Sequence, residues 1–291
     1  MSIDLLHERI RKMKNPAVVD LRILPESLPP HLLEEEGNLC DAYGRFCREM
    51  MKSLCDLVPG IRFPFGSFAL MGPQGLQLLQ TLLAQAKDLG YYVILDGPEM
   101  LSPWAAQMAA QTLMGTQDFP CDAVLICPYI GSDAVKPFAP YCTQNDKELF
   151  VVVRGPNKSA SELQDMLSGS RHVHVAAAEI ANRFAETAMA KCGYSHIGVV
   201  GSATMAVSLQ NVRLKHKKMF ILVDGLDYPS ANAKNCASAF DRVGHGAAVC
   251  AGPYVTMAWQ EAQSDGKDYL DCARNAAERM RKNITRYVTV L

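Results

Sequence analysis

Short apolar runs alternate with longer amphipathic stretches along the whole chain. The runs are four to six residues long and rich in β-branched side chains, which is typical of buried parallel strands. Eight of them qualify as strands: residues 17–21, 61–64, 91–96, 123–127, 149–154, 196–200, 219–223 and 247–251. Helical spacing of apolar residues predicts helices over residues 41–57, 75–89, 103–114, 175–191 and 231–242, and a last one over 267–286.

This alternation predicts the fold class. Strands separated by helices form parallel βα units with right-handed crossovers, and eight such units are enough to close a single (β/α)₈ TIM barrel. No linker, repeat or low-complexity tract divides the chain, so we expect one α/β barrel domain over residues 1–291. A doubly wound open sheet is the alternative, but it usually has a glycine-rich first turn. The first turn here, residues 20–25, contains no glycine.

The N-terminal segment is predicted to be part of the folded protein. Ile3, Leu6, Ile10 and Met13 follow helical spacing and indicate an amphipathic helix. The segment lacks the uninterrupted apolar core of a secretory signal. No apolar run approaches the roughly 20 residues needed to cross a bilayer. We therefore expect a cytoplasmic protein with no membrane partner.

The composition of the chain limits the kinds of partner that it is expected to bind. Hydrophobic residues make up 49% of the chain and charged residues 20%, as in an ordinary globular protein with a sizeable core. The net charge of −1 argues against nucleic acid as a partner, because nothing would neutralise a phosphate backbone. The ten cysteines form no Cys-x-x-Cys pair and mostly lie in apolar contexts. We therefore expect reduced thiols and no metal site.

In a barrel of this kind, chemistry lies at the C-terminal ends of the strands. That rule selects the polar residues that follow the predicted strands: Arg22, Arg62, Asp96, Cys127, Tyr129, Arg154, Ser202, Thr204, Asp224, Asp227 and Cys250. The most informative stretch is 93–101, in which a β-branched run ends in Asp96 and is followed by a Gly-Pro turn.

Two interpretations of these strand ends stay open. Asp96 either acts as a general base or pairs with a nearby arginine. Arg22, Arg62 and Arg154 either converge on an anionic ligand or neutralise the acids of the same rim. Those acids are Asp96, Glu99, Asp224 and Asp227.

Several segments resemble one known family. Residues 122–138 read Asp-Ala-Val-Leu-Ile-Cys-Pro-Tyr-Ile-Gly-Ser-Asp-Ala-Val-Lys-Pro-Phe. This is similar to the Asn-Pro-Tyr-x-Gly-x-Asp-x-x-x-Pro-Phe run of the longer bacterial subgroup of orotidine 5'-phosphate decarboxylases. Residues 15–19, 150–164, 199–204 and the final helix resemble that subgroup too, so the resemblance covers essentially the whole chain.

The resemblance implies a fold, a reaction and an assembly. The family converts orotidine 5'-phosphate to uridine 5'-phosphate and CO₂ in pyrimidine biosynthesis, without a cofactor. It forms TIM barrels that pair as homodimers, with the barrel mouths near the interface. We therefore expect a carboxy-lyase scaffold, no cofactor, a homodimer and an anionic small-molecule ligand.

The resemblance also indicates which family positions have changed. Asp96 matches the first aspartate of the Asp-x-Lys-x-x-Asp pattern, and Arg62 falls on the second-strand lysine. Pro98 replaces the lysine that protonates the carbanion, and Leu101 replaces the aspartate contributed across the dimer interface. The first-strand aspartate, the pyrimidine-contacting serine and the phosphate-binding arginine fall on Arg22, Pro156 and Pro253.

These replacements predict weak or no decarboxylase activity. Proline offers neither a side-chain donor nor a backbone N–H, and two acids, Asp224 and Asp227, would repel a phosphate dianion. The candidate catalytic residues are Asp96 and Arg62. The candidate substrate-binding residues are Arg22, Arg154, Tyr129 and Thr204.

Three functions remain open at this stage. One is a silent homologue that acts as a binding or regulatory partner. The second is a repurposed barrel enzyme that acts on another anionic small molecule. The third is a divergent but active decarboxylase, so whether the chain is an enzyme stays undecided.

Overall fold

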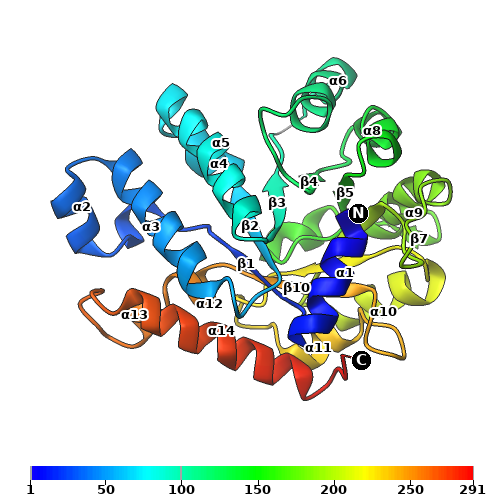
Figure 1. Cartoon of the computed structure of the whole chain (residues 1–291). Helices are drawn as coiled ribbons and strands as arrows, with labels where there is room; N and C mark the ends of the chain where they lie inside the picture. The colour runs from blue at the N-terminus through cyan, green and yellow to red at the C-terminus, as the bar shows by residue number, and fades with distance from the viewer. Residues whose placement is uncertain (1, 99, 291) are drawn as a thin grey trace.

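Eight parallel strands close into a barrel in the computed structural model, which describes residues 2–98 and 100–290 (Figure 1). Around the barrel the strands are β1 (Ala17–Asp20), β2 (Gly60–Pro64), β3 (Tyr92–Asp96), β4 (Ala123–Ile126), β5 (Glu148–Val152), β8 (Ile197–Ser202), β9 (Ile221–Asp224) and β10 (Ala247–Ala251). Each predicted strand is confirmed to within two residues at its ends. The predicted TIM barrel is therefore confirmed, and the open-sheet alternative is wrong.

Helices surround the barrel (Figure 1). The longer ones are α1 (Ser2–Met13), α2 (Pro30–Glu36), α3 (Leu39–Leu54), α5 (Gly72–Asp88), α6 (Pro103–Ala110), α9 (Val173–Ala185), α10 (Ala206–Lys215) and α14 (Tyr269–Thr285). The short helices are α4 (Phe65–Ala69), α7 (Ser132–Val135), α8 (Ala139–Gln144), α11 (Ala233–Ala237), α12 (Pro253–Thr256) and α13 (Ala258–Glu261). The 3₁₀ turns are Pro25–Ser27 and Lys158–Glu162, and α6 continues into a π-helical turn, Gln111–Gly115.

Some predicted helices are shorter in the structure. The helix predicted over 175–191 ends at Ala185, because the chain then turns and pairs Met189 with Ser195. Within 231–242 only α11 forms, since Asp241 draws the following residues into a loop by accepting the N–H groups of Val243 and His245. A small hairpin, β6 (Leu167–Ser168) and β7 (Arg171–His172), was not predicted.

The strand register sets the polar strand ends side by side. Asp20 of β1 is the register partner of Arg62 on β2. Asp96 of β3 lies opposite Pro64, and Asp224 of β9 lies opposite Ser202. Because the strands are parallel, all these residues reach the same rim, which we call the mouth.

Helix α1 is the amphipathic helix that the N-terminal spacing predicts. Ile3, Leu6 and Ile10 are buried. The backbone N–H of Ile3 donates to Oε1 of Glu148 at 3.1 Å, and Nδ1 of His196 lies 2.7 Å from the same oxygen. These contacts fix α1 at the N-terminal ends of β5 and β8, opposite the mouth. No helix among residues 2–98 and 100–290 is both long and apolar enough to span a membrane.

A buried arginine, Arg213 of α10, ties together the segments that enter the last two strands. Its guanidinium donates to the carbonyl oxygens of Ala239 at 2.7 Å and Gly246 at 2.6 Å. It also donates to those of Lys217 at 2.9 Å and Met219 at 3.0 Å. Each carbonyl would be left without this partner if the side chain were removed.

Replacing Arg213 with alanine should therefore lower the free energy of unfolding by about 3 kcal/mol. The Arg213→Lys variant should recover only part of this loss, because an ammonium cannot reach the same four acceptors. Urea unfolding followed by circular dichroism measures both. Arg242→Ala, which removes an exposed arginine, is the control and should change stability by less than about 0.5 kcal/mol. Equal losses of unfolding free energy in Arg213→Ala and Arg242→Ala would contradict the stabilising role of the Arg213 hydrogen bonds.

Candidate functional site

The guanidinium of Arg62 lies at the centre of the mouth and is 6% exposed. Nε and Nη2 donate to the two carboxylate oxygens of Asp96, each at 2.7 Å. Nη1 donates to Oδ2 of Asp224 at 3.0 Å and lies 3.8 Å from Oδ2 of Asp20. The Sγ atom of Cys250 lies 3.9 Å from Nη1. Carboxylates from three other strands thus surround one cation.

The sequence builds this cluster by repeating one local pattern. Strands β1, β3 and β9 each consist of apolar residues followed by a terminal aspartate: Ala-Val-Val-Asp20, Tyr-Val-Ile-Leu-Asp96 and Ile-Leu-Val-Asp224. The buried apolar residues hold each strand in the barrel wall. The carboxylate is then carried to the mouth, where Arg62 can reach all three.

Burial and the two arginines, Arg62 and Arg22, shift the pKa values of Asp20 and Asp224 in opposite directions. Burial raises the pKa of Asp20 to about 7, although Arg62 and Arg22 oppose the shift. Its Oδ1 accepts the backbone N–H of Arg22, but its Oδ2 accepts no hydrogen bond within the described residues. Burial alone would raise the pKa of Asp224 too, yet Arg62 and Arg22 hold it below its usual value. Asp20 is therefore the group of this pair that retains a proton to higher pH.

Arg22 and Asp227 form a second ion pair at the rim, beside the cluster around Arg62. Nη2 of Arg22 lies 3.5 Å from Oδ2 of Asp227, and its Nε lies 3.7 Å from Oδ2 of Asp20. Oδ1 of Asp227 also accepts the backbone N–H groups of Gly252 at 3.0 Å and Tyr254 at 2.9 Å. The loop after β9 is thereby fastened to the loop after β10, and a carboxylate of the chain itself occupies both N–H groups.

The loop after β5 meets the loop after β9 at the same rim. Gly225 has a φ of +83°, and a Cβ atom there would lie 2.1 Å from Cβ of Pro156. Only glycine allows this approach. At the centre of the mouth, Arg62, Asp20 and Asp224 are all buried.

The remaining candidate residues lie outside this cluster. Arg154 forms an ion pair with Asp165 at 3.0 Å and donates to Oγ1 of Thr204 at 3.1 Å. It therefore does not converge with Arg22 and Arg62 on one point. Tyr129 is 78% exposed and lines an apolar groove apart from the ion pairs. Glu99, the fourth acid expected at the rim, lies outside the described residues.

Sequence reasoning missed two acids that shape the site. Asp20 ends β1, but the predicted strand-end residue was Arg22, two residues later. The available signal was the apolar run ending in aspartate, which is the same signal that identified Asp96. Asp165, the partner of Arg154, comes from the irregular segment between β5 and α9. No local pattern distinguishes it from other exposed acids.

The contacts of this cluster argue against roles in proton transfer and anion binding. Both oxygens of Asp96 accept hydrogen bonds from Arg62, so Asp96 is not poised as a general base. Asp96, Asp224 and Asp20 hold the pKa of Arg62 well above its ordinary value, although burial alone would lower it, and the guanidinium cannot give up a proton. Four carboxyl groups face two guanidinium groups, so the centre of the mouth does not favour an anion. The geometry supports neutralisation of acids by arginines over the predicted anion site.

The protonation of Asp20 predicts a pH dependence of stability. An acid whose pKa is raised by folding stabilises the folded state below its unfolded pKa, and this contribution is lost as the pH rises through its folded pKa, here about 7. An asparagine keeps the Oδ1 acceptor and never ionises. The Asp20→Asn variant should therefore gain stability relative to the wild type as the pH rises from about 4 to about 7. Denaturant unfolding at several pH values measures this difference.

Asp224→Asn is the matched comparison, because its shift has the opposite sign. The pKa of Asp224 is lowered in the folded protein, so its carboxylate stabilises the fold at neutral pH and loses this effect in acid. Asp224→Asn should be less stable than the wild type near pH 7, and the difference should shrink as the pH falls. The same pH trend in both variants would refute the opposite pKa shifts of Asp20 and Asp224.

Comparison with known sequences places the chain beside one group of enzymes. The orotidine 5'-phosphate decarboxylase of Clostridium novyi (strain NT) is 28% identical over 288 residues, which are 98% of each sequence. That of Rhodopirellula baltica is 25% identical over 274 residues, which are 91% of each sequence. No family model matches the chain.

Solved structures of the same group share the barrel. Leishmania donovani OMP decarboxylase superposes with a TM-score of 0.72 at 23% identity and covers 99% of both chains. Plasmodium berghei orotidine 5'-monophosphate decarboxylase gives a TM-score of 0.75 at 13% identity, over 97% of this chain and 98% of the other. At these identities the structural likeness establishes the fold, while the sequence relationship extends over nearly the whole of both proteins. Over nearly its whole length the chain is therefore similar to the orotidine 5'-phosphate decarboxylases.

Proposed function

We propose that this chain is a member of the decarboxylase family with little or no decarboxylase activity, and that it acts as a non-catalytic binding partner. The observation that carries the proposal is the position of Arg62, whose three guanidinium nitrogens all donate to Asp96 or Asp224. The resemblance places a family lysine at this residue. A substrate anion would have to compete with both carboxylates for this cation.

Proton supply is the first requirement that the mouth does not meet. Loss of CO₂ leaves a carbanion that a positioned acid must protonate. Pro98 stands where the resemblance places that acid, and it has neither a side-chain donor nor an N–H. Arg62 cannot substitute for it, because three aspartates keep the guanidinium protonated.

Phosphate binding is the second requirement. Backbone N–H groups and a cation normally hold a phosphate group. Here Asp227 accepts the N–H groups of Gly252 and Tyr254 and lies 3.5 Å from Arg22. A phosphate would have to displace this carboxylate and approach Asp224 as well, against electrostatic repulsion in a partly dry site.

A repurposed enzyme is less well supported. That function needs a free base or a free anion site in the mouth. Asp96 is engaged through both oxygens, and Arg154 is engaged by Asp165 and Thr204. A cytoplasmic location remains a prediction.

Loss of the decarboxylase reaction can be tested directly. We expect that this chain does not restore growth to a pyrimidine-requiring bacterial strain that lacks its own decarboxylase. We also expect no release of CO₂ above background when the purified protein is given orotidine 5'-phosphate labelled in the carboxyl group. The Clostridium novyi homologue, expressed to the same level, is the positive control. Robust growth with this chain would contradict the proposal.

An apolar rim supports a dimer of this chain. Nine of the fourteen exposed large hydrophobic residues in the described chain fall in the loops and first helices that follow β1 to β5. They are Leu24, Leu70, Leu101, Trp104, Met108, Tyr129, Leu163, Met166 and Leu167. Scattered exposed apolar residues are normal, but a concentration on one rim is typical of a protein interface. We propose that a second copy of the chain covers this rim.

The dimer can be tested by charge insertion. Leu101 is 87% exposed and Trp104 is 73% exposed, so the double variant Leu101→Glu, Trp104→Glu should fold normally and yet sediment as a monomer. The wild type should sediment as a dimer in analytical ultracentrifugation. Leu214→Glu carries its charge on α10, at a leucine of similar exposure outside the rim, and should remain dimeric. A monomeric wild type, or a double variant that stays dimeric, would refute this interface.

A further inference from the structure

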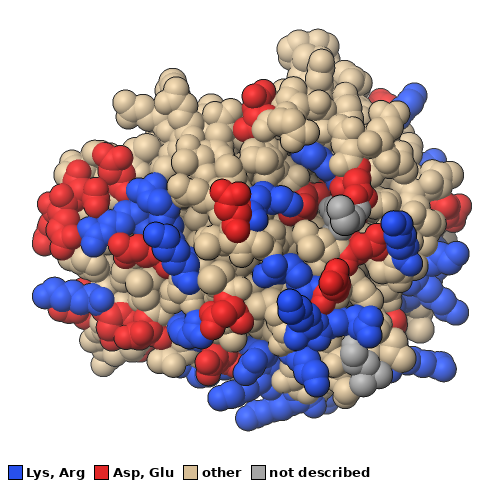
Figure 2. All heavy atoms as spheres, in the orientation of Figure 1, with Lys and Arg blue, Asp and Glu red and all other residues tan. Residues whose placement is uncertain are grey.

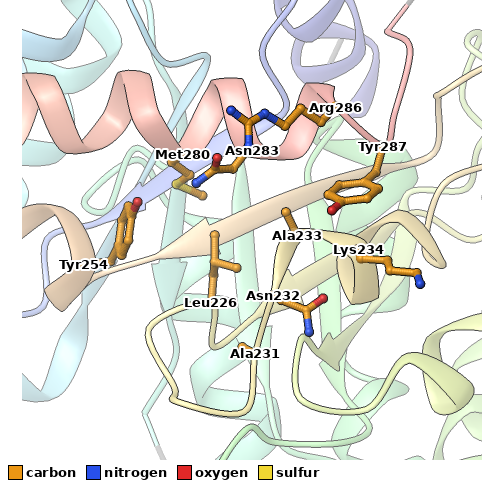
Figure 3. A pocket seen from close by; sticks show the side chains of 10 residues that line it. All are labelled: Leu226, Ala231, Asn232, Ala233, Lys234, Tyr254, Met280, Asn283, Arg286 and Tyr287. Atoms are coloured by element: carbon orange, nitrogen blue, oxygen red, sulfur yellow. The ribbon is translucent and has the colours of Figure 1, made fainter.

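A cavity of about 460 Å³ lies outside the mouth, between the loop after β9, α11, α12 and α14. Its size is in the range of small-molecule sites. Figure 3 shows Asn283 and Arg286 on the α14 side facing Asn232 across the cavity, with Tyr254 at one end and Tyr287 at the other. Leu226 and the buried side chain of Met280 form apolar parts of its wall.

The polar lining of this cavity is cationic. Arg286 and Lys234 are its charged residues, and no aspartate or glutamate lines it. Neither cation forms an ion pair with any acid among residues 2–98 and 100–290. In Figure 3 the guanidinium of Arg286 lies beside Asn283 in front of α14, whereas Lys234 points outward from the edge of the cavity. Arg286 is therefore placed to contact a ligand directly, with Lys234 contributing charge at the entrance.

The surrounding surface reinforces this charge. Residues 279–286 contain four cations, Arg279, Arg281, Lys282 and Arg286, and no acid, although the whole chain has a net charge of −1. Figure 2 shows lysine and arginine side chains gathered along the lower edge of the molecule, where α11 and the C-terminal half of α14 lie in Figure 1. Such a local excess attracts anions and concentrates them near the opening.

We propose that this cavity binds a small phosphate-bearing metabolite, with the phosphate on Arg286. Guanidinium groups bind phosphate through paired N–H donors. The amides of Asn232 and Asn283 and the hydroxyl groups of the two tyrosines can donate to or accept from sugar or ring substituents. The apolar wall accommodates a ring face. The site is distinct from the mouth, whose cations are engaged by aspartates.

The cavity is structurally connected to the mouth. Leu226 precedes Asp227 in the same loop, and the N–H of Tyr254 donates to the carboxylate of Asp227. A ligand held between α14 and this loop would therefore also hold the loop that closes the mouth.

Calorimetric titration with inorganic phosphate and with ribose 5-phosphate tests the proposal, at constant ionic strength. Ribose 5-phosphate should bind saturably and more tightly than phosphate. The Arg286→Gln variant should weaken its binding about 10-fold, the order of one lost charge-assisted contact. Lys282→Gln is the matched control: it removes the same charge from an exposed residue of α14, one turn before Arg286, that does not line the cavity, and should weaken binding less than about 2-fold.

Three outcomes would overturn the proposal. One is the absence of saturable binding by either probe. Another is an equal loss in Arg286→Gln and Lys282→Gln, which would indicate diffuse attraction to a basic surface. The third is binding that Arg22→Gln abolishes and Arg286→Gln does not, which would place the anion in the mouth. Unfolding midpoints of all variants establish that they are folded.

Discussion

The bidentate ion pair between Arg62 and Asp96 is the contact around which the mouth of this barrel is arranged. A guanidinium offers paired donors in one plane, and here two of them meet both oxygens of one carboxylate at 2.7 Å. The third nitrogen reaches Asp224 and approaches Asp20. Three acids can enter this buried space only because the cation is there, since an unpaired buried charge costs several kcal/mol.

The same constraint explains why the charged residues of the mouth occur together. An arginine at position 62 without acids around it would be a buried, unpaired cation, and three acids without the arginine would repel one another. Arg22 and Asp227 extend the arrangement to the rim, and Asp227 satisfies the N–H groups that begin the segment after β10. The mouth is therefore stabilised by contacts within the chain, while unpaired cations lie on the outer face near α14.

Local sequence signals were sufficient for much of the fold and part of the site. Buried β-branched runs identified all eight strands, because a parallel strand buried on both faces needs an apolar residue at nearly every position. The strand-end rule identified Arg62, Asp96, Asp224 and Asp227. It did not identify Asp20 as the third partner of Arg62, and it grouped Arg154 with arginines that it does not meet. Helix ends were less predictable, since turns and loop contacts decided them.

The sequence by itself determined the barrel, the resemblance to one group of enzymes and the set of polar residues at the strand ends. These follow from periodicity and local composition, which are properties of neighbouring residues. Only the tertiary structure decided which acid pairs with which arginine, because that depends on strand register and on contacts between residues as distant as 62 and 224. It also decided that the α14 cavity has a cationic lining, since its walls come from segments brought together by closure of the barrel.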